Sequence, residues 1–189
     1  VWYDTADGNP DDLIAQIGLP CVVKPIDCGS SVGVSIVSDR AALEAALSEA
    51  AKWGRRVLVE KKIVGRELTV GVLDGRALPP VEIIPKSGFY DYRNKYQGTT
   101  LEICPAEIPA GITSLVSSLS LRAFEVLRLD GYARFDFILD ANGTPWCLEA
   151  NALPGMTPTS LLPQEAAAVG ISYPDLCERI LLLSMRKKR

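Results

Sequence analysis

The fold class is decided by the stretch YARFDFILDANGTPWCLEAN, which occupies residues 132–151. Two apolar runs, Tyr132 to Leu139 and Pro145 to Asn151, flank the dipeptide Asn142-Gly143. Asn-Gly is a strong hairpin signal, because a type I′ turn needs a positive φ at both of its central residues. A two-residue turn would pair Ala141 with Thr144 and would fix the register of the two strands. The stretch therefore predicts an antiparallel hairpin.

The register counted from that turn predicts which side chains face each other. Asp136 would lie opposite Glu149, and Arg134 would lie opposite Asn151. Because successive side chains on a strand point to opposite faces, all four would share one face of the sheet. If the loop carries a bulge instead, the register shifts by one residue, and the bulge must restore this facing.

Two carboxylates that face each other across a sheet repel and need a compensating cation. Asp136, Glu149 and Asn151 offer only oxygen ligands, which suit Mg²⁺ rather than zinc. The hairpin alone leaves a second interpretation open, namely a polar sheet face on which Arg134 simply pairs with Asp136.

Strands and helices alternate through the rest of the chain, with frequent hairpins. The expected strands are Val1 to Tyr3, Cys21 to Lys24, Val34 to Val37, Val57 to Lys61, Glu67 to Leu73 and Ala77 to Ile84. The expected helices are Asp11 to Ile17, Asp39 to Trp53 and Thr113 to Leu127, followed by two short ones near the C-terminus. The polar and aromatic segment from Gly88 to Gly98 predicts a loop or lid. This mixture indicates an α+β layered fold.

Composition excludes several classes of function. The 189 residues contain 20 basic and 23 acidic side chains, a net charge of −3 that gives no reason to expect nucleic acid or an anionic membrane as a partner. No run of 18 apolar residues predicts a membrane span. The chain has no histidine, which excludes Ser-His-Asp catalysis and histidine metal sites. Its five cysteines show no Cys-x-x-Cys spacing and are expected to be reduced, as in a cytoplasmic protein.

A Gly/Ser loop and two lysines point to a phosphate ligand. The loop from Cys28 to Gly33 would let backbone N–H groups approach a phosphate, although a plain hairpin turn would look the same. It is not a Walker A loop, because no Gly-Lys-Ser/Thr follows. Lys24 and Lys61 each end an apolar strand and need an anionic partner, unless they reach solvent by snorkelling. Together with the oxygen-ligand site, these features predict binding of a magnesium nucleoside triphosphate.

Over about residues 1–183, the sequence resembles the D-alanine–D-alanine ligases, which are members of the ATP-grasp superfamily. The matching strings are VKP at 23–25, GSSVG at 29–33, VEK at 59–61, FYDY at 89–92, KY at 95–96, ARFD at 133–136, LEAN at 148–151, PGMT at 154–157 and SL at 160–161. The resemblance implies two α+β subdomains with mostly antiparallel sheets that grip the nucleotide between them. They would be a central subdomain, residues 1–66 and incomplete at its N-terminus, and a C-terminal catalytic subdomain, residues 67–189.

The resemblance also implies roles for individual residues. The nucleotide-binding residues would be Lys24, Ser30, Ser31, Glu60, Lys61, Ile63, Glu67 and Lys95, where Glu67 takes the ribose hydroxyls. The residues around the second substrate would be Lys95, Tyr96, Arg134, Gly155, Ser160 and Leu161. Asp136, Glu149 and Asn151 would bind two Mg²⁺ or Mn²⁺ ions. Arg134 would stabilise the oxyanion, and Ser30 and Tyr96 would hydrogen-bond to shut the lid.

The implied reaction joins two D-alanines at the expense of ATP, through a D-alanyl phosphate, for peptidoglycan precursor synthesis. The intact enzyme would be a cytoplasmic homodimer. Complete ligases carry an N-terminal domain and an upstream lysine without a counterpart in these residues, and Val1 suggests a piece of something longer. Two alternatives stay open: a truncated nucleotide-binding module without turnover, and a ligase that joins D-alanine to D-lactate or D-serine.

Overall fold

The computed structural model describes residues 1–4, 9–29, 31–85 and 100–186. These divide into two compact units, residues 1–63 and residues 64–85 with 100–186. The second unit begins at Val64, and the strand Gly65–Leu73 follows at once. The boundary expected between residues 66 and 67 therefore falls inside that strand. The segment expected to form a lid, Gly88 to Gly98, lies outside the described residues.

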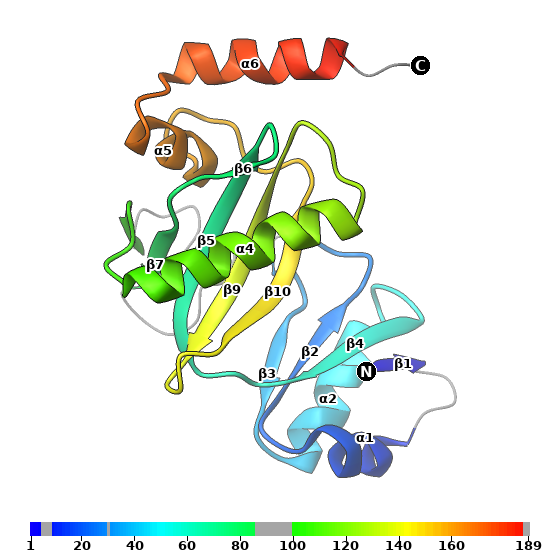
Figure 1. Ribbon diagram of the computed structural model, residues 1–189. Helices are drawn as coiled ribbons and strands as arrows, with labels where there is room; N and C mark the ends of the chain where they lie inside the picture. Colours follow the sequence, from blue (N-terminus) through cyan, green and yellow to red (C-terminus); the bar gives the residue numbers. More distant parts are fainter. Residues whose placement is uncertain (5–8, 30, 86–99, 187–189) are drawn as a thin grey trace. The chain divides into compact units, whose positions relative to one another are not determined.

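The first unit is a four-stranded antiparallel sheet with two helices (Figure 1). Its strands, in spatial order, are β1 (Trp2–Asp4), β4 (Arg56–Lys61), β2 (Cys21–Pro25) and β3 (Ser35–Val37). Its helices are α1 (Pro10–Ile17) and α2 (Arg40–Ala50). Each helix begins at a residue whose side chain accepts a hydrogen bond from the first turn, Asn9 for α1 and Asp39 for α2.

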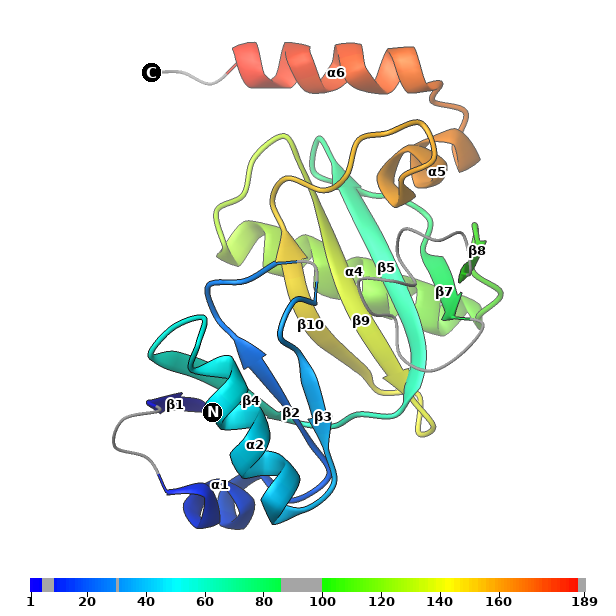
Figure 2. The same cartoon turned by 180° about the vertical axis from the view of Figure 1, so that it is seen from behind.

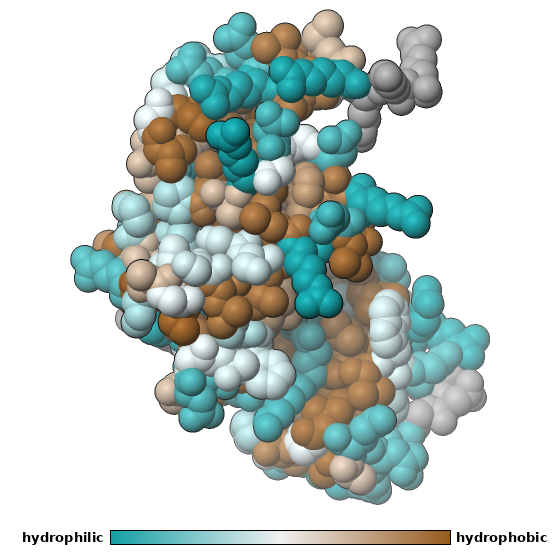
Figure 3. All heavy atoms as spheres, viewed as in Figure 1, coloured by the Kyte–Doolittle hydropathy of each residue, from teal (hydrophilic) through white to brown (hydrophobic). Residues whose placement is uncertain are grey.

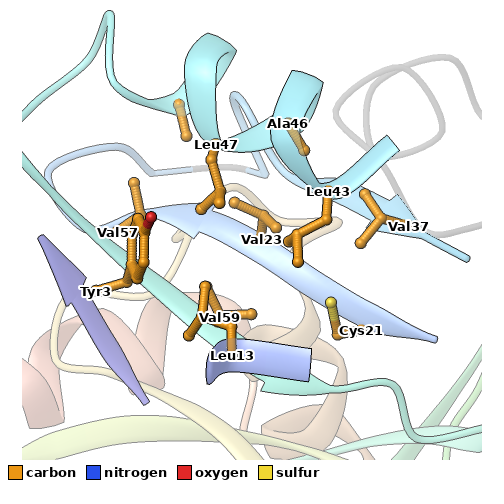
Figure 4. Close-up of a cluster of buried hydrophobic side chains, with 11 residues drawn as sticks. Tyr3, Leu13, Cys21, Val23, Val37, Leu43, Ala46, Leu47, Val57 and Val59 are labelled. Carbon is orange, nitrogen blue, oxygen red and sulfur yellow. The ribbon is translucent and has the colours of Figure 1, made fainter. Parts of the chain in front are cut away.

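The core of the first unit lies between one face of this sheet and the two helices. Alternate residues of the strands point inward, among them Val23, Val57 and Val59, which are all fully buried. Leu43 and Leu47 of α2 point down onto them (Figure 4). Each such side chain contributes about 1.5–3 kcal/mol when it is fully buried. The other face of the sheet is consequently free to carry polar side chains.

The second unit is built on a larger antiparallel sheet. Its main path runs β10 (Pro145–Asn151), β9 (Tyr132–Asp140), β5 (Gly65–Leu73), β7 (Val81–Pro85) and β8 (Thr100–Ile103), with β6 (Arg76–Ala77) paired to β5. Its helices are α4 (Ala110–Val126), α5 (Leu161–Ala168) and α6 (Tyr173–Met185). The single strand expected from Ala77 to Ile84 is divided into β6 and β7, because Pro79-Pro80 supplies no backbone donor for a ladder.

Helix α4 covers only one face of this sheet (Figure 1). Val70, Phe135 and Phe137 are fully buried on that face and pack in one cluster with Val116 of α4. The view from behind shows the opposite face of β9 and β10, with α4 beyond it (Figure 2). Alternation places Arg134 and Asp136 on this second face, as the sequence predicts.

The hairpin of β9 and β10 has a different turn from the one expected. Pro145 pairs with Leu139, and only Gly143 of the Asn-Gly dipeptide has a positive φ, 79°, so the loop has three residues rather than two. The reason is Asp140, whose carboxylate accepts the N–H groups of Asn142 and Thr144, both at 2.9 Å.

A bulge between Cys147 and Glu149 then restores the expected register. Beyond it, Glu149 pairs with Asp136 and Asn151 pairs with Arg134. The predicted facing of these four side chains is therefore confirmed, by the bulged alternative rather than by the two-residue turn.

Helix α6 is the most exposed helix of the second unit, with only Leu176 fully buried. Hydrophobic and hydrophilic side chains alternate over it at the upper end of the space-filling view (Figure 3). None of the helices in the described part of the chain is both long and apolar enough to cross a membrane. All five cysteines are free.

Candidate functional site

The open face of β10, β9 and β5 brings Arg134 together with the three expected metal ligands, Asp136, Glu149 and Asn151. Each of the three strands contributes two side-chain positions to this face, and these positions lie opposite one another across the strands. The pairs are Glu149 and Asn151 on β10, Asp136 and Arg134 on β9, and Thr69 and Gly71 on β5. Asp136 thus lies between Glu149 and Thr69, and Arg134 lies between Asn151 and Gly71.

Arg134 and Asp136 form a two-pronged ion pair on this face. The Nε and one terminal nitrogen of Arg134 each donate to a different oxygen of Asp136 at 2.9 Å. The two side chains are only 13% and 18% exposed. Burial alone would raise the pKa of Asp136, but the hydrogen bonds and charge of Arg134 and the hydroxyl of Thr69, at 2.6 Å, hold that pKa below its ordinary value. Asp136 is therefore ionised at neutral pH.

Asn151 lies between the two acidic side chains. Its amide nitrogen donates to Asp136 at 3.0 Å and to Glu149 at 3.1 Å. The NH₂ group thus bridges two carboxylates, which is a place where a cation would also be favourable. Turning the amide over would present its oxygen, and the three side chains would then supply an all-oxygen ligand set of the kind Mg²⁺ prefers. Among the described residues, no group of three or more histidine, cysteine, aspartate or glutamate side chains is arranged so that it could hold a metal ion. The candidate set is two carboxylates and an amide.

A further carboxyl group, that of Glu165 on α5, also reaches this face. Glu165 is completely buried, and its Oε1 accepts the N–H of Gly71 at 2.9 Å. Burial raises its pKa to about 8, and the charge of Asp136 adds to this, whereas the N–H of Gly71 and the charge of Arg134 act in the opposite direction. Glu165 is therefore largely protonated at neutral pH.

The start of α5 places a second group of expected residues. The Oγ of Ser160 accepts the N–H of Thr157 at 3.0 Å and lies close to Gly155, where an added Cβ would be 3.1 Å from it. The side chain of Leu161 is buried, so only its backbone N–H, in the first turn of the helix, can meet a ligand. The hydroxyl of Tyr173 donates to the carbonyl of Met156 at 2.7 Å and fixes the loop between β10 and α5.

In the first unit, Lys24 and Glu60 lie on the sheet face opposite the helices. The Nζ of Lys24 is 2.5 Å from a carboxylate oxygen of Glu60. The anionic partner that a strand-end lysine needs is therefore within the chain. Alternation along β4 places Lys61 on the other face from Glu60, and Lys61 is exposed, as the snorkelling interpretation expects. The N–H of Ile63, shortly after the end of β4, donates no hydrogen bond within the described residues.

The Gly/Ser loop joins β2 to β3, as a hairpin loop. Ser31 and Gly33 both have a positive φ, 60° and 72°. Gly33 is required, because an added Cβ would lie 2.7 Å from the ring of Pro25. Ser30, Lys95 and Tyr96 lie outside the described residues, and Glu67 is half-buried on β5. The ligand roles expected for all these residues stay predictions.

Comparison with known proteins shows the family. A sequence model described as "D-ala D-ala ligase C-terminus" matches residues 2–182. The chain belongs to this D-alanine–D-alanine ligase family. A protein named D-alanine–D-alanine ligase from Methylacidiphilum infernorum is 49% identical over 166 residues, which cover 87% of this chain and 55% of that protein. A protein of the same name from Desulfotalea psychrophila is 43% identical over 198 residues and is covered to 62%. The chain thus spans little more than half the length of these ligase relatives.

Solved structures confirm the ATP-grasp fold of the ligases, in its α+β form. A D-alanine–D-alanine ligase from Bacillus anthracis superposes with a TM-score of 0.87 at 38% identity, over 98% of this chain and 61% of that one. The same enzyme complexed with ATP gives a TM-score of 0.84 at 36% identity.

Sequence reasoning missed three residues of the polar face on β10, β9 and β5. Thr69 and Gly71 carry a weak signal, since they alternate with the apolar residues of β5 in the same way as Asp136 and Arg134 do on β9. Glu165 occupies an apolar position of α5, four residues after Leu161 and three after Leu162, both of which are buried. A charged residue at such a position is a signal for a buried carboxyl group.

Proposed function

We propose that this chain is the ATP-binding and catalytic portion of a D-alanine–D-alanine ligase. The observation that carries the proposal is the polar face on which Asp136, Glu149 and Asn151 gather oxygen ligands beside Arg134. The family's name, and the ATP complex of the Bacillus anthracis enzyme, support the choice of nucleotide and reaction.

The metal-binding residues would be Asp136, Glu149 and Asn151, whose oxygen donors suit the two expected Mg²⁺ or Mn²⁺ ions. When bound, such an ion supplies positive charge that neutralises the phosphate oxygens during phosphoryl transfer. Asp136 is already ionised, which lowers the free-energy cost of taking up the ion. Asn151 would turn its amide oxygen toward the ion and give up its two hydrogen bonds to the carboxylates.

The proposed reaction has two steps. A carboxylate oxygen of the first D-alanine attacks the γ-phosphorus of ATP, ADP leaves, and an acyl phosphate forms. The amine of the second D-alanine then attacks the acyl carbon, and inorganic phosphate leaves as the C–O bond breaks and a proton is lost from nitrogen. Arg134 would stabilise the negative oxygen of the tetrahedral intermediate. We expect Arg134→Ala in the intact ligase to lower turnover by about 10²–10³, with a smaller effect on ATP affinity.

We propose a role for each of the expected nucleotide-binding residues. Lys24 would exchange Glu60 for a phosphate, and Glu60, Lys61 and the unbonded N–H of Ile63 would meet the adenine. Glu67 would take the ribose hydroxyls. The remaining expected contacts come from Ser31 of the Gly/Ser loop and from Ser30 and Lys95, with Tyr96 closing the lid.

The second D-alanine would lie at the start of α5. Its carboxylate would receive the hydroxyl of Ser160 and the backbone N–H of Leu161, because the first turn of a helix leaves its N–H groups free and carries a partial positive charge. Gly155 would keep this approach open, since a side chain there would crowd Ser160. Lys95 would add a positive charge.

The proposal is tested by calorimetric titration of the chain with Mg·ATP. Glu149→Gln is the informative variant, because Glu149 is exposed and its loss leaves the Arg134–Asp136 pair intact. Glu178→Gln on α6 is the matched control, an exposed carboxylate outside the site. We expect saturable binding that Glu149→Gln weakens at least about tenfold and Glu178→Gln leaves unchanged. Equal binding by all three proteins would overturn the metal assignment.

A narrower proposal follows from the length of the chain. Since it spans 55% of the length of the Methylacidiphilum relative, the isolated chain would bind nucleotide without turnover, and the longer protein would catalyse. Phosphate release with D-alanine, D-lactate or D-serine as the second substrate distinguishes the ligase classes. We place the longer protein in the cytoplasm, where the five free cysteines would stay reduced, and propose a homodimer, which sedimentation would test.

A further inference from the structure

The carboxyl group of Glu165 is only half satisfied where it lies. Glu165 is completely buried, and its Oε1 accepts the N–H of Gly71. Its Oε2 is also buried, and it has no hydrogen-bond partner among the described residues. A buried polar oxygen without a partner is unfavourable and calls for a physical reason. The surroundings of Oε2 supply one.

Glu165 fills the position of a side chain that β5 lacks. A Cβ added to Gly71 would lie only 2.2 Å from Oε2, so the oxygen occupies almost the place of that missing atom. Gly71 is the cross-strand partner of Arg134, and side chains in such pairs have their Cβ atoms about 4.5–5.5 Å apart. Oε2 is therefore a direct lateral neighbour of Arg134. Burial acts to lower the pKa of Arg134, but the hydrogen bonds and charge of Asp136 and, after them, the charge of an ionised Glu165 raise it above its ordinary value.

Arg134 thus has two acidic neighbours but bonds to only one of them. The two hydrogen bonds that Arg134 donates, from Nε and from one terminal nitrogen, both go to Asp136. A cation held by Asp136 and Glu149 would weaken this bond, because it would compete for the same oxygens and would repel the guanidinium. Arg134 would then need another acceptor on the same face. The unpartnered Oε2 of Glu165 is the buried oxygen beside it. The carboxyl group is largely protonated in the free protein at neutral pH, and the guanidinium would favour release of that proton to solvent as it moves toward Oε2, which then accepts from it.

We infer that Glu165 is a positioning residue for Arg134, whose guanidinium it holds on the polar face when Asp136 is engaged by a cation. The inference rests on the proposed metal site and adds to it a residue from α5. Glu165 itself touches neither substrate nor metal. Its action passes through Arg134, and the glycine at position 71 makes its approach possible.

A purely structural role would be limited to the hydrogen bond with Gly71. In that case Glu165 and Arg134 would contribute to stability independently of each other. The two roles are separated by a double-mutant cycle of Glu165→Gln and Arg134→Met, with unfolding in urea at pH 9, above the pKa of about 8 of Glu165. We expect the unfolding constants to deviate from additivity by about fivefold or more. Glu178→Gln with Arg134→Met is the control pair and should be additive, and additive effects for Glu165 as well would overturn the inference.

A second measurement keeps the test decisive if the double variant does not fold. Hydrogen exchange of the Arg134 Nε–H is followed by NMR at neutral pH in the original chain and in Glu165→Gln. Without Mg·ATP, we expect protection in both, because Asp136 holds the group. With Mg·ATP bound, exchange should become about tenfold or more faster in Glu165→Gln alone, the factor that loss of one charged hydrogen bond corresponds to.

The result is kept separate from the proposed function by calorimetry on the same samples. If Mg·ATP binds and the Nε–H stays equally protected in both proteins, the positioning role is wrong although the nucleotide site stands. If Mg·ATP does not bind either protein, the proposed function fails, and the cycle at pH 9 still decides whether Glu165 and Arg134 interact.

Discussion

Arg134 and Asp136 are each mostly buried, and each depends on the other for its charge balance. Removing one member of such a pair leaves an uncompensated charge in a poorly solvated place. The same pair would be loosened by a bound cation, so that the stability of the free protein and the chemistry of the site draw on the same two side chains. The structural and the functional interpretations of this pair are therefore compatible.

Replacement of Asp136 by asparagine should consequently destabilise the fold. We expect a loss of about 3 kcal/mol in the free energy of unfolding, because Arg134 keeps its charge and loses its anionic partner. Urea denaturation followed by circular dichroism measures this change. Glu178→Gln, on the exposed surface of α6, should change the free energy by less than about 0.5 kcal/mol. Equal stabilities of the two variants would contradict the assignment.

Gly71 should not tolerate a side chain while Glu165 is present. An added Cβ would lie 2.2 Å from Oε2 and 2.5 Å from a methyl group of Leu162. Gly71→Ala should therefore cost about 1–3 kcal/mol through overpacking. Glu165→Ala in the same chain should restore more than half of the loss, whereas Gly111→Ala, in open space, should be harmless. Thermal denaturation of the original chain and the three variants measures these changes. If Glu165→Ala restores no stability to Gly71→Ala, Glu165 does not occupy the space beside Gly71.

Glu165 also predicts how stability depends on pH. Its pKa is raised by burial from 4.5 to about 8 in the folded state. Between these two values the folded protein holds a proton that the unfolded chain has released, so stability falls as pH rises through this window. The groups that face Glu165 are Arg134, Asp136 and Cys104, whose own pKa is raised to about 11 by burial and the charge of Glu165.

The difference between the original chain and Glu165→Gln isolates this contribution. We expect the stability advantage of the original chain to shrink between pH 5 and pH 8 and to stay constant above that. Urea midpoints at several pH values measure it, and the opposite pH dependence of Asp136 cancels in the difference. Parallel curves for the two proteins would contradict the raised pKa of Glu165.

The residues of the site differ in how well their positions can be predicted from the sequence. Arg134, Asp136, Glu149 and Asn151 follow from alternation on two adjacent strands, and their facing is a local property. Glu165 does not, because it is 94 residues from Gly71 and enters from another element. No local pattern can report which helix will pack over a glycine.

At the scale of elements, the β9–β10 hairpin shows where propensity ends. Asn-Gly favours a two-residue turn, but Asp140 offers the loop two side-chain acceptor bonds that such a turn could not use. Its second oxygen also accepts the ring N–H of Trp146 at 3.0 Å. Which of the two loops forms depends on the geometry of these hydrogen bonds, which the sequence pattern does not give. Only the two strands and the side chains that face each other across them were predictable.

Helix α5 positions both Glu165 and Ser160, so its packing should matter more than that of α6. Leu162 of α5 is fully buried, whereas Leu181 of α6 is 60% exposed. Leu162→Ala should cost about 2–5 kcal/mol through the cavity it leaves. Leu181→Ala, a chemically identical change, should cost far less. Denaturant unfolding of both variants measures the contrast, and similar losses would show that α5 is not anchored as described.

The whole molecule has separate cores in its two units. Tyr3, Leu13 and Val59 belong to one cluster, and Phe135 and Val70 belong to another. A sequence shows the strands of both but not their allocation, because strand order within a sheet depends on contacts distant in the chain. The boundary that we expected after residue 66 consequently fell within β5.

Separate cores predict separate responses to a mutation. Leu43→Ala removes a fully buried side chain of α2 and should cost the first unit about 2–5 kcal/mol. Hydrogen exchange should accelerate in β2 and β4, while the amides of β5 and β9 keep their protection. Mass spectrometry of peptides from the four strands measures both. Uniform acceleration in all four would mean that the units unfold as one.

The three-residue loop and the bulge after Cys147 have a consequence for how this gene can change. Counted from the Asn-Gly dipeptide, the loop takes one extra residue, Ala141, from the side of β9, and the bulge takes one from β10, so that Glu149 still lies opposite Asp136. A codon lost from the bulge would leave Cys147 paired with Phe137 and Glu149 paired with Asp136. A codon lost from the loop would shorten the turn to two residues and leave its closing pair, Asp140 and Thr144, in place. Length variation between related genes should therefore concentrate at these two places and spare the strand segments between them.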